Sequence, residues 1–375
     1  MSTEPVAPIT YAAAGVDVEA GDRAVELMKA SVRRATRPEV LGGLGGFAGM
    51  FDASALARMT RPVLATSTDG VGTKVAIAQA LDKHDTIGFD LVGMVVDDIV
   101  VCGAEPLFMT DYIATGKVVP ERIAAIVGGI ARACEEAGVA LVGGETAEHP
   151  GLLDPDEYDV AGAATGVVEH AAVLGPQRVA DGDVVIALAS SGLHSNGYSL
   201  VRRVIAAAGW DLGRHVDDFG RTLGEELLEP TRIYTRPLLD LIAADGVDVH
   251  ALSHVTGGGL AANLARVLPT GMFARLDRAT WTPPAVFRTV AQLGRVPQAD
   301  LERTLNQGIG FVAVLPEAQA QRAIEQAEAS GIPAWRLGDV TTMDKARVES
   351  GTEVVHGAKG VDGGSVQVVG THPTA

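Results

Sequence analysis

Only two cysteines occur among the 375 residues of this chain, Cys102 and Cys134. They do not form a Cys-x-x-Cys pair, which argues against a metal site or a redox motif built on thiols. Free cysteine is among the most buried residue types, so we expect two structural thiols in a reducing cytoplasm. Aromatic residues make up only 4% of the chain, and its cores must therefore consist mainly of Ala, Val, Leu and Ile.

Long apolar runs and an excess of basic residues are also missing. No run reaches the 18 apolar residues of a membrane-spanning helix. The N-terminal segment does not combine a basic start with an apolar core, so we do not expect a signal peptide. The net charge of −17 argues against a general nucleic-acid-binding protein. An acidic protein can bind phosphate only through local groups such as backbone amides, helix N-termini or a metal ion. For a nucleotide ligand, the charge therefore predicts magnesium dependence.

Several common site motifs are absent from the sequence. There is no G-x-x-x-x-G-K-[ST] sequence, which excludes a P-loop, and no G-x-S-x-G nucleophile elbow. The histidines do not show zinc spacing.

The length of the chain predicts two domains. We expect a flexible lead over 1–10, an N-terminal domain over 11–172, a C-terminal domain over 173–347 and a disordered or loosely packed tail over 348–375. The boundary follows a polar, turn-rich stretch from Pro176 to Asp183, after which strands and helices alternate as in mixed α/β layers. The tail is rich in Gly, Val and Thr without periodicity.

Hydrophobic periodicity and turn residues predict the elements of both halves. Helices are expected over 21–35, 89–102, 120–138, 196–208, 259–267 and 317–330, with a further helix starting at Pro230. Strands are expected over 63–66, 107–114, 139–142, 160–168, 184–189, 249–253, 310–315 and, as the last one, 335–340.

The stretch Asp69-Gly70-Val71-Gly72-Thr73-Lys74 follows a short apolar strand and carries the most chemical information. Glycines let backbone N–H groups approach an anion closely. The lysine adds a positive charge, and the aspartate can hold a magnesium ion that itself binds phosphate. The alternative is a charged turn at the end of a strand.

Acidic residues within an apolar helix are a second signal. Asp97 and Asp98 lie between valines, a methionine and an isoleucine, and Asp90 falls on the same helix face as Asp97. Burial of a carboxylate is costly unless it is paired or bound to a metal. We favour metal ligation together with Asp69; the alternative is pairing with an Arg or Lys of another segment.

Three further loops follow predicted strands. Gly143-Gly144-Glu145-Thr146 is expected to face the same crevice as Asp69, although a simple turn would also fit. Ser190–Gly197 and His254–Gly259 each join a strand to a helix start, where free amides bind anions. His194 could be a hydrogen-bond donor, a proton carrier or a cap. Together the last two loops indicate a site for a phosphorylated small molecule.

Ten motifs resemble one known family, that of phosphoribosylformylglycinamidine cyclo-ligase, also called aminoimidazole ribonucleotide synthetase. They are Tyr11–Asp17, Arg37–Phe47, Thr68–Lys74, His84–Gly88, Asp98–Pro106, Asp111–Lys117, Gly143–Glu148, Ser190–Ser199, Pro230–Tyr234 and His254–Gly259. The similarity spans about residues 10 to 345 in the expected order. Asp97 departs from it, because asparagine is expected there, and the tail after about 350 has no counterpart.

The resemblance implies a two-domain α/β fold whose N-terminal domain dimerises through its sheet. It implies a homodimeric ligase of purine biosynthesis that forms a C–N bond, uses ATP and Mg²⁺ and acts on formylglycinamidine ribonucleotide. ATP phosphorylates the formyl oxygen, the amidine nitrogen attacks the activated carbon, and phosphate leaves to give 5-aminoimidazole ribonucleotide. No nucleic acid or membrane is expected as a partner.

The resemblance also implies roles for individual residues. The nucleotide would be bound by Lys29, Gly43, Gly45, Gly46, Asp69, Gly70, Gly72, Thr73, Lys74, Gly143, Gly144 and Thr146. Magnesium would be held by Asp69, Asp98 and Glu145. Catalysis would depend on Lys74, Asp98, His194 and His254. Asp98 and Lys74 are both expected to be essential for turnover but not for folding.

Rival interpretations come from two classes. Within the same superfamily, a thiamine monophosphate kinase, a selenophosphate synthetase or a hydrogenase maturation factor would share the nucleotide loops but use another acceptor. The strings Ser190–Ser199 and His254–Gly259 favour the cyclo-ligase over these. A non-catalytic nucleotide-binding regulator would not need the acidic residues of the apolar helix.

Overall fold

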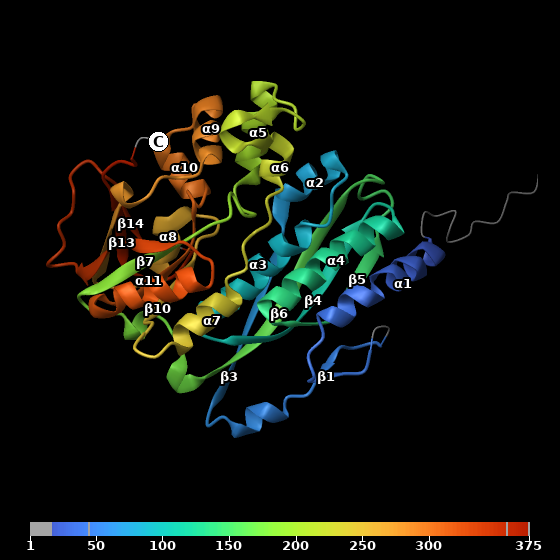
Figure 1. The fold of residues 1–375 in the computed structure, drawn as a ribbon, viewed down its shortest axis with the longest axis horizontal. Coiled ribbons are helices and arrows are strands. Elements are labelled where there is room, and N and C mark those ends of the chain that lie inside the picture. Colours follow the sequence, from blue (N-terminus) through green and yellow to red (C-terminus); the bar gives the residue numbers. More distant parts are fainter. Residues whose placement is uncertain (1–16, 44–45, 358, 374–375) are drawn as a thin grey trace, which may run out of the picture.

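The computed structural model describes residues 17–43, 46–357 and 359–373, and it consists of two α/β halves that lie side by side (Figure 1). The expected lead over 1–10 lies outside the described residues. Each half has its own β-sheet, and the two-domain α/β architecture predicted from the sequence is confirmed. Among the described residues, no helix is both long and apolar enough to cross a membrane.

The first half contains a four-stranded sheet in the order β3-β6-β4-β5. Its strands are β3 (Pro62–Gly70), β4 (Glu105–Thr115), β5 (Ala140–Glu148) and β6 (Tyr158–Glu169), with a hairpin of β1 (Val40–Leu41) and β2 (Met50–Phe51). Its helices are α1 (Val18–Arg34), α2 (Val75–Leu81), α3 (Ile87–Val100) and α4 (Pro120–Ala137). The pairs β3–β6 and β6–β4 are antiparallel, whereas α4 connects β4 to β5 in parallel.

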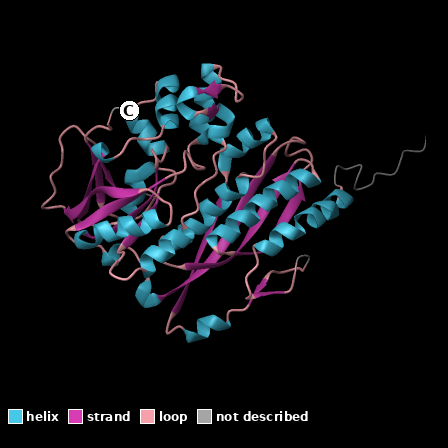
Figure 2. Ribbon diagram, in the orientation of Figure 1, coloured by secondary structure: helices cyan, strands magenta, loops and turns pink. Residues whose placement is uncertain are grey.

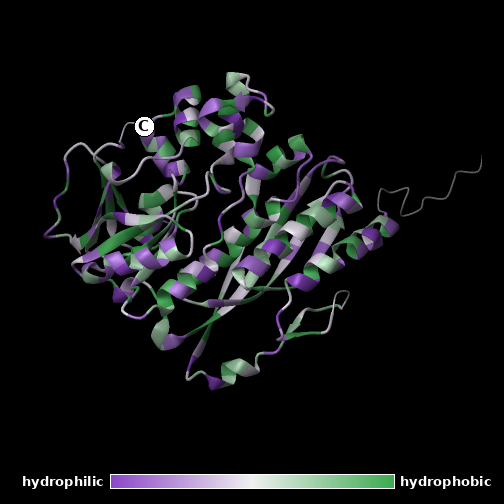
Figure 3. Ribbon diagram, viewed as in Figure 1, coloured by the Kyte–Doolittle hydropathy of each residue, from purple (hydrophilic) through white to green (hydrophobic). Residues whose placement is uncertain are grey.

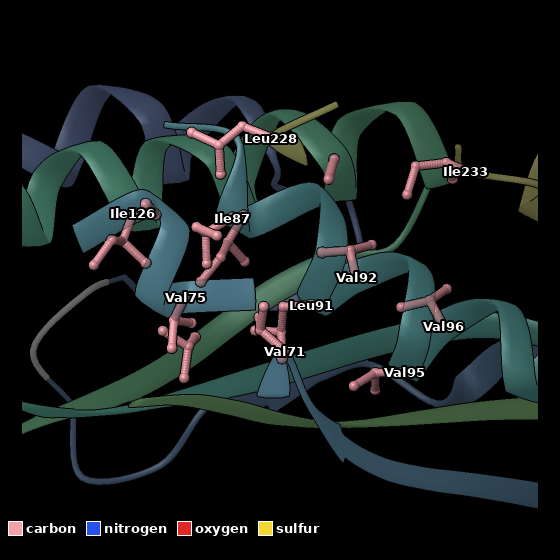
Figure 4. Packing of buried hydrophobic residues seen from close by; sticks show 14 of the residues in the cluster. Val71, Val75, Ile87, Leu91, Val92, Val95, Val96, Ile126, Leu228 and Ile233 are labelled. Atoms are coloured by element: carbon pink, nitrogen blue, oxygen red, sulfur yellow. The ribbon is translucent and has the colours of Figure 1, made fainter. Parts of the chain in front are cut away.

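Helix α3 lies at the centre of the molecule. It packs on β3 and β6 of the sheet, on α4, and on elements of the second half, which explains why it is apolar nearly all round. Figure 4 shows Leu91 and Val95 of α3 in one core with Leu228 and Ile233 from the second half. The two halves therefore share a core in addition to their own.

The second half is built on a seven-stranded sheet in the order β10-β12-β7-β13-β11-β15-β14. Its strands are β7 (Asp183–Ala189), β10 (Ala251–His254), β11 (Met272–Asp277), β12 (Ile309–Pro316), β13 (Ala334–Thr342), β14 (Val354–His356) and β15 (Ser365–Val369), beside a separate pair, β8 (His215–Val216) and β9 (Arg221–Thr222). Its helices are α5 (Tyr198–Ala208), α6 (Leu223–Leu227), α7 (Thr235–Ala243), α8 (Gly259–Val267), α9 (Ala285–Gly294), α10 (Gln298–Thr304) and α11 (Ala320–Ala329).

Helices cover both faces of this sheet (Figure 2). Alternate residues of β12 enter different cores: Val312 and Val314 pack on the α8 side, while Phe311 and Ala313 pack on the α7 and α11 side. Period-two alternation between two buried faces leaves a strand apolar throughout.

The tail after residue 350 differs from the expectation of a disordered or loosely packed segment. Strand β15 is buried along its whole length and pairs in parallel with β11, while β14 pairs with its other side. The side chain of Gln367 is fully buried; its amide donates to the carbonyl oxygens of Glu349 and Thr352, and its own oxygen accepts from the Glu349 N–H. The tail is thus an integral part of the second sheet.

Other boundaries also differ from the sequence prediction. Strand β11 and helices α9 and α10 were not predicted, and β13 is not the last strand. The helix expected to start at Pro230 begins at Thr235, because the preceding residues are not helical and the backbone N–H groups of Thr231 and Tyr234 donate to buried carboxylates of α3.

The four-stranded sheet has one covered and one open face. Helices α3 and α4 cover one face, and on the other Leu64 is 62% and Tyr112 is 40% exposed. Figure 3 shows hydrophobic segments alternating with paler and hydrophilic ones along these strands. The hairpin covers part of the open face, where Phe51 packs on Phe108 at 5.4 Å between ring centroids.

Replacement of Gln367 by Leu should destabilise the protein. The variant leaves three backbone groups without their partner, and each unsatisfied buried group costs about 1–3 kcal/mol. Thermal and urea unfolding should show a clear loss of stability, whereas Gln321→Leu on the exposed face of α11 should change little. If Gln367→Leu unfolded at the same temperature and urea concentration as the native protein, the described packing of the tail would be contradicted.

The carboxyl group of Asp111 should make stability depend on pH. It lies among buried residues of β4, and burial raises its pKa to about 7, from an ordinary value of 3.8. The folded state then favours the protonated form, so this group stabilises the fold at low pH. Its contribution is lost as the pH rises, by about 1.4 kcal/mol for each pH unit between about pH 4 and 7.

Urea unfolding across that pH range tests this directly. Asp111→Asn should remove much of the slope and be more stable than the native protein at pH 8. Asp245→Asn, at an exposed position, serves as the matched control. An unchanged slope in Asp111→Asn would show that Asp111 ionises as it does in the unfolded chain.

Candidate active site

Two helix starts face each other across a cleft between the halves. The cleft has a volume of about 280 Å³ and is lined by Asp69–Thr73 on one side and Ser195–Ser199 on the other, with Met94 of α3. The first segment leads through a short turn into α2, and the second leads into α5. Helix N-termini carry unpaired N–H groups and attract anions, so both walls suit phosphate.

The backbone on both walls depends on glycine. Gly72 has φ of +73° and Gly197 has φ of +81°, which is the left-handed region that glycine tolerates best. Side chains hold the walls together: the Ser195 hydroxyl donates to the Val71 carbonyl at 2.6 Å, and the hydroxyls of Thr73 and Ser199 are 3.2 Å apart. The sequence analysis paired Asp69 with Gly143–Thr146 and Ser190–Gly197 with His254–Gly259, so the meeting of the Asp69 and Ser195 loops in one crevice is a finding of the structure.

The structure also brings Asp69, Asp98 and His254 together. Burial raises the pKa of Asp69, and the negative charge of Asp98 raises it further. The Asp98 side chain is 42% exposed, which corrects the expectation that both Asp97 and Asp98 are buried. On α3 the two residues point in different directions: Asp98 is partly exposed and contacts His254, whereas Asp97 points to the interior.

His254 ends strand β10 and is oriented by two contacts. Its Nδ1 lies 2.9 Å from Asp98 Oδ1, and its ring stacks on Phe311 at 4.9 Å. Since a carboxylate only accepts hydrogen bonds, Nδ1 carries the proton when the ring is neutral, and Nε2 then has a free lone pair. The following loop is tied to the cleft because the Gly257 N–H donates to Asn196 at 3.1 Å.

The two buried acids of α3 are held by the second half rather than by a metal. Asp90 accepts from the N–H and hydroxyl of Thr231 at 3.1 and 2.7 Å. Asp97 accepts from the Tyr234 N–H at 3.1 Å and the Thr235 hydroxyl at 2.7 Å, at the start of α7. For Asp90 and Asp97, pairing with another segment therefore replaces the metal ligation that we favoured from the sequence.

Lys74 does not face the cleft. Its side chain is fully buried, and its ammonium donates to Asp90 at 2.6 Å, to the His194 carbonyl at 3.0 Å and to the Glu229 carbonyl at 2.6 Å. An ammonium has three N–H donors, so none is left for a phosphate. Burial lowers the pKa of Lys74, and the adjacent Asp90 carboxylate opposes that effect.

His194 is buried as well, as is His254. Its Nε2 accepts from the Ser191 N–H at 3.2 Å, which places the ring proton on Nδ1. Burial lowers the pKa of His194 well below its usual value, so the ring is neutral at physiological pH. Like Asp98 and His254, it is not among the residues that line the cleft. Its carbonyl accepts from Lys74, and the role of its ring as donor, proton carrier or cap stays a prediction.

The other predicted nucleotide and metal residues lie elsewhere in the chain. Strand pairing places Glu145 in register with Gly70 across the whole sheet, roughly 14 Å apart at about 4.8 Å per strand. Gly143, Gly144 and Thr146 share this far edge of the sheet, and a Cβ at Gly144 would lie 2.3 Å from the Asp111 carboxylate. We expected Glu145 to face the same crevice as Asp69. Within a single chain, the two residues lie at opposite edges of the sheet instead.

The glycine loop after Leu41 lies near this same edge. A Cβ at Gly49 would lie 2.6 Å from the carbonyl oxygen of Val142, which precedes Gly143. Gly43 and Gly46 are exposed, whereas Gly45 lies outside the described residues. Lys29 pairs with Glu26 of its own helix α1. The predicted site residues thus fall into two groups at opposite edges of the first sheet.

The residues present fit a magnesium–nucleotide complex better than a bare metal ion. Within the described ranges, no three His, Cys, Asp or Glu side chains form a ready-made metal site. Asp69 and Asp98 place two carboxylates beside a cleft whose walls suit phosphate, and Mg²⁺ commonly binds one or two carboxylates plus phosphate oxygens and waters. The bound phosphates would complete such a site.

Sequence reasoning missed several residues that fix this geometry. Thr231 and Thr235 hold the buried acids, and Glu229 supplies a carbonyl to Lys74. Of these, only Thr231 lies in the string Pro230–Tyr234, which resembled the family but suggested no chemistry by itself.

Fold and cleft together define a two-domain α/β protein with a cleft between its halves whose walls suit phosphate groups. Family models agree: one described as AIR synthase related protein, N-terminal domain, matches residues 51–168, and the corresponding C-terminal domain matches residues 180–350. Relatives then narrow the class. A phosphoribosylformylglycinamidine cyclo-ligase from Xanthomonas campestris pv. campestris is 50% identical over 335 residues, which cover 89% of this chain and 97% of the relative. The chain belongs to the phosphoribosylformylglycinamidine cyclo-ligase family.

A relative from a different bacterial genus agrees. The phosphoribosylformylglycinamidine cyclo-ligase of Desulfitobacterium hafniense is 49% identical over 332 residues, which cover 88% of this chain and 96% of the relative.

Solved structures support the fold at lower identity. Thiamine-monophosphate kinase from Stenotrophomonas maltophilia has a TM-score of 0.62 at 19% identity, covering 92% of this chain and 97% of its own. The hydrogenase maturation protein HypE, in complex with ATP, has a TM-score of 0.64 at 19% identity, covering 94% and 95%. At such identity the likeness concerns the fold alone.

Substitution of Lys74 by Met should destabilise the protein, contrary to the sequence-based expectation that Lys74 is not needed for folding. It leaves Asp90 buried without its cation, which costs about 3–5 kcal/mol. Urea unfolding should show this loss, whereas Lys83→Met, at an exposed position, should be near neutral. Adding Asp90→Asn to Lys74→Met should restore part of the stability. Native stability of Lys74→Met alone would exclude a structural role.

Proposed function

We propose that the chain closes the imidazole ring of formylglycinamidine ribonucleotide with ATP, giving 5-aminoimidazole ribonucleotide, ADP and phosphate in purine biosynthesis in the cytoplasm. It is a ligase that forms a C–N bond. Membership of the family at about 50% identity over 88% of the chain supports this reaction. The observation that carries the assignment of the site is the convergence of Asp69, Asp98 and His254 beside a cleft with two helix starts.

The reaction has two steps at adjacent atoms. The formyl oxygen attacks the γ-phosphorus of ATP, ADP leaves, and the formyl carbon becomes bound to a phosphorylated oxygen. The amidine nitrogen then attacks that carbon and loses a proton, and the C–O bond breaks to release phosphate. Phosphoryl transfer depends mainly on positioning and charge neutralisation, which the cleft walls can supply.

The walls divide this work between the two halves. Asp69–Thr73 would bind the triphosphate, with Mg²⁺ held by Asp69 and Asp98 to neutralise its charge. The amides at the start of α5 would bind the phosphate of the ribonucleotide. This division follows from the chain itself, since the carboxylates lie in the first half and the second helix start lies across the cleft.

His254 is suited to take the proton released during ring closure. Asp98 fixes its Nδ1–H, and this leaves Nε2 as the basic atom. The stacking on Phe311 fixes the plane of the ring. His194 would instead act through its backbone, by holding Lys74 at the joint between the halves.

A homodimer would bring the two groups of predicted residues together. The open face of the first sheet exposes Leu64 and Tyr112, and a second copy could cover it. A two-fold axis parallel to the strands would set the β5 edge of one copy over the β3 edge of the other. The glycine loop and Glu145 would then complete the nucleotide site of the partner.

The alternative of a thiamine monophosphate kinase-like phosphotransferase has less support. The likeness to such a kinase is limited to the fold at 19% identity, whereas the cyclo-ligases match along nearly their whole length. Phosphate release separates the possibilities. Purified protein should release phosphate from ATP only when formylglycinamidine ribonucleotide is added, and release with thiamine monophosphate or with no acceptor would contradict the proposal.

Asp98→Asn should lower kcat for phosphate release at least about 100-fold, because it removes one electrostatic stabiliser and the partner of His254. Its unfolding midpoint should stay close to that of the native protein, since the side chain is partly exposed. Asp240→Asn, at an exposed position of α7, is the matched control and should retain full activity. Native kcat in Asp98→Asn would remove the carboxylate pair from the mechanism.

A further inference from the structure

A second pocket lies in the other half of the molecule, between helices α8 and α10 and the C-terminal tail. It has a volume of about 760 Å³ and is walled by residues of α8, by α10 and by the segment from Gly351 to His372. Figure 1 shows α8 beside β14, in agreement with the contacts between them. Pockets of 300–1,000 Å³ commonly hold small organic ligands.

The wall formed by the tail lies beyond the residues that match the family models, which end at residue 350. The pocket shares no lining residue with the cleft of Asp69. It is therefore a candidate site of its own, formed by a segment that the family resemblance did not cover.

His372 lines this pocket and carries a ring nitrogen without a hydrogen-bond partner in the described part of the chain. Its Nδ1 lies 3.2 Å from the carbonyl oxygens of both Arg278 and Trp281, so Nδ1 must carry the proton and donate. The Nε2 lone pair is buried and has no partner among the described residues. Burial lowers the pKa of His372, which keeps the ring neutral. An unpaired buried acceptor is costly and calls for a donor.

Gln307 presents the complementary group. It lines the pocket, its residue is 5% exposed, and its side-chain amide nitrogen is buried without a partner in the described part of the chain. Its backbone is fixed, because its carbonyl accepts from the Trp281 indole N–H at 3.0 Å. The amide N–H thus calls for an acceptor on the same ligand.

The charges around the pocket are balanced. Arg278 forms a two-pronged pair with Glu302 at 2.6 and 2.8 Å, and Arg303 pairs with Glu353 at 2.6 Å. The remaining walls include apolar side chains such as Leu260 and Val368. With no spare charge to offer, the pocket favours a ligand without net charge.

We propose that this pocket binds a neutral, planar nitrogen heterocycle of the nucleobase class. An exocyclic amine would donate to His372 Nε2, and a ring nitrogen would accept from the Gln307 amide. Trp281, whose ring meets that of His372 edge-on at 4.5 Å, would contact the ligand's ring. No bond is made or broken, so the site is one of binding alone.

A ligand bound in this pocket could affect the catalytic cleft through two short connections. Gly258 lines the pocket, and its neighbour Gly257 donates to Asn196 in the cleft. Gln307 follows Asn306, whose amide donates to the Gly192 carbonyl in the loop before α5. A ligand would therefore act on the loops that hold the substrates, which suits regulation by a purine or pyrimidine compound.

Tryptophan fluorescence of the purified full-length protein tests the proposal. The chain has three tryptophans, and Trp281 is the one that lines the pocket. Titration with 9-methyladenine, which has both donor and acceptor, should give a saturable change in emission. 9-Methylpurine, which lacks the amine, should bind at least tenfold more weakly. No saturable change with 9-methyladenine or 1-methylcytosine up to millimolar concentration would overturn the proposal.

Variants locate the binding. His372→Leu removes the acceptor and should weaken 9-methyladenine binding at least tenfold, whereas His356→Leu, at another tail histidine outside the pocket, should not. Asp98→Asn should bind normally, which separates this site from the cleft. Equal binding in folded His372→Leu and native protein would overturn the assignment. Should His372→Leu fail to fold, the comparison of the two purines on the native protein still decides.

Discussion

The joint between the two halves depends on one buried cation. Lys74 belongs to the first half, and its ammonium is bonded to Asp90 of α3 and to two backbone carbonyls of the second half. A charged group with no access to water is stable only if all its donors are satisfied. The position of the second half is therefore specified by polar geometry as well as by the apolar core that both halves share. The cleft lies beside this joint, and so its width is set there.

The same principle separates the two kinds of acid on α3. Asp90 and Asp97 point inward and accept hydrogen bonds from the second half, whereas Asp98 is partly exposed and contacts His254. Consecutive helical residues point about 100° apart, so neighbours can serve structure and chemistry respectively. Asp97, which stands where the family resemblance led us to expect asparagine, is one of the two acids that bind the second half.

The sequence was enough to predict the α/β class, most of the elements and the proximity of Asp69 to Asp98, but it did not predict the contact between Asp98 and His254. It could not show which acids of α3 face the interior, because the helix is apolar all round and periodicity then gives no direction. Lys74 follows two glycines, a pattern typical of phosphate sites, while its true partners lie in distant segments. Strand order is equally hidden, and it placed Glu145 at the far edge of the sheet. The tail was missed because a strand buried on both faces shows no alternation.

The insertion of β15 between β11 and β14 has a consequence for synthesis on the ribosome. Domains form as the chain emerges, and the N-terminal one forms first. The first half can complete its sheet once β6 has left the ribosome, but β11 keeps an unpaired edge until residues 365–369 are made. Parallel pairing over such a sequence separation is intrinsically slow. Nascent chains stalled before residue 365 should thus expose that edge to chaperones and to aggregation, while their first half is already native.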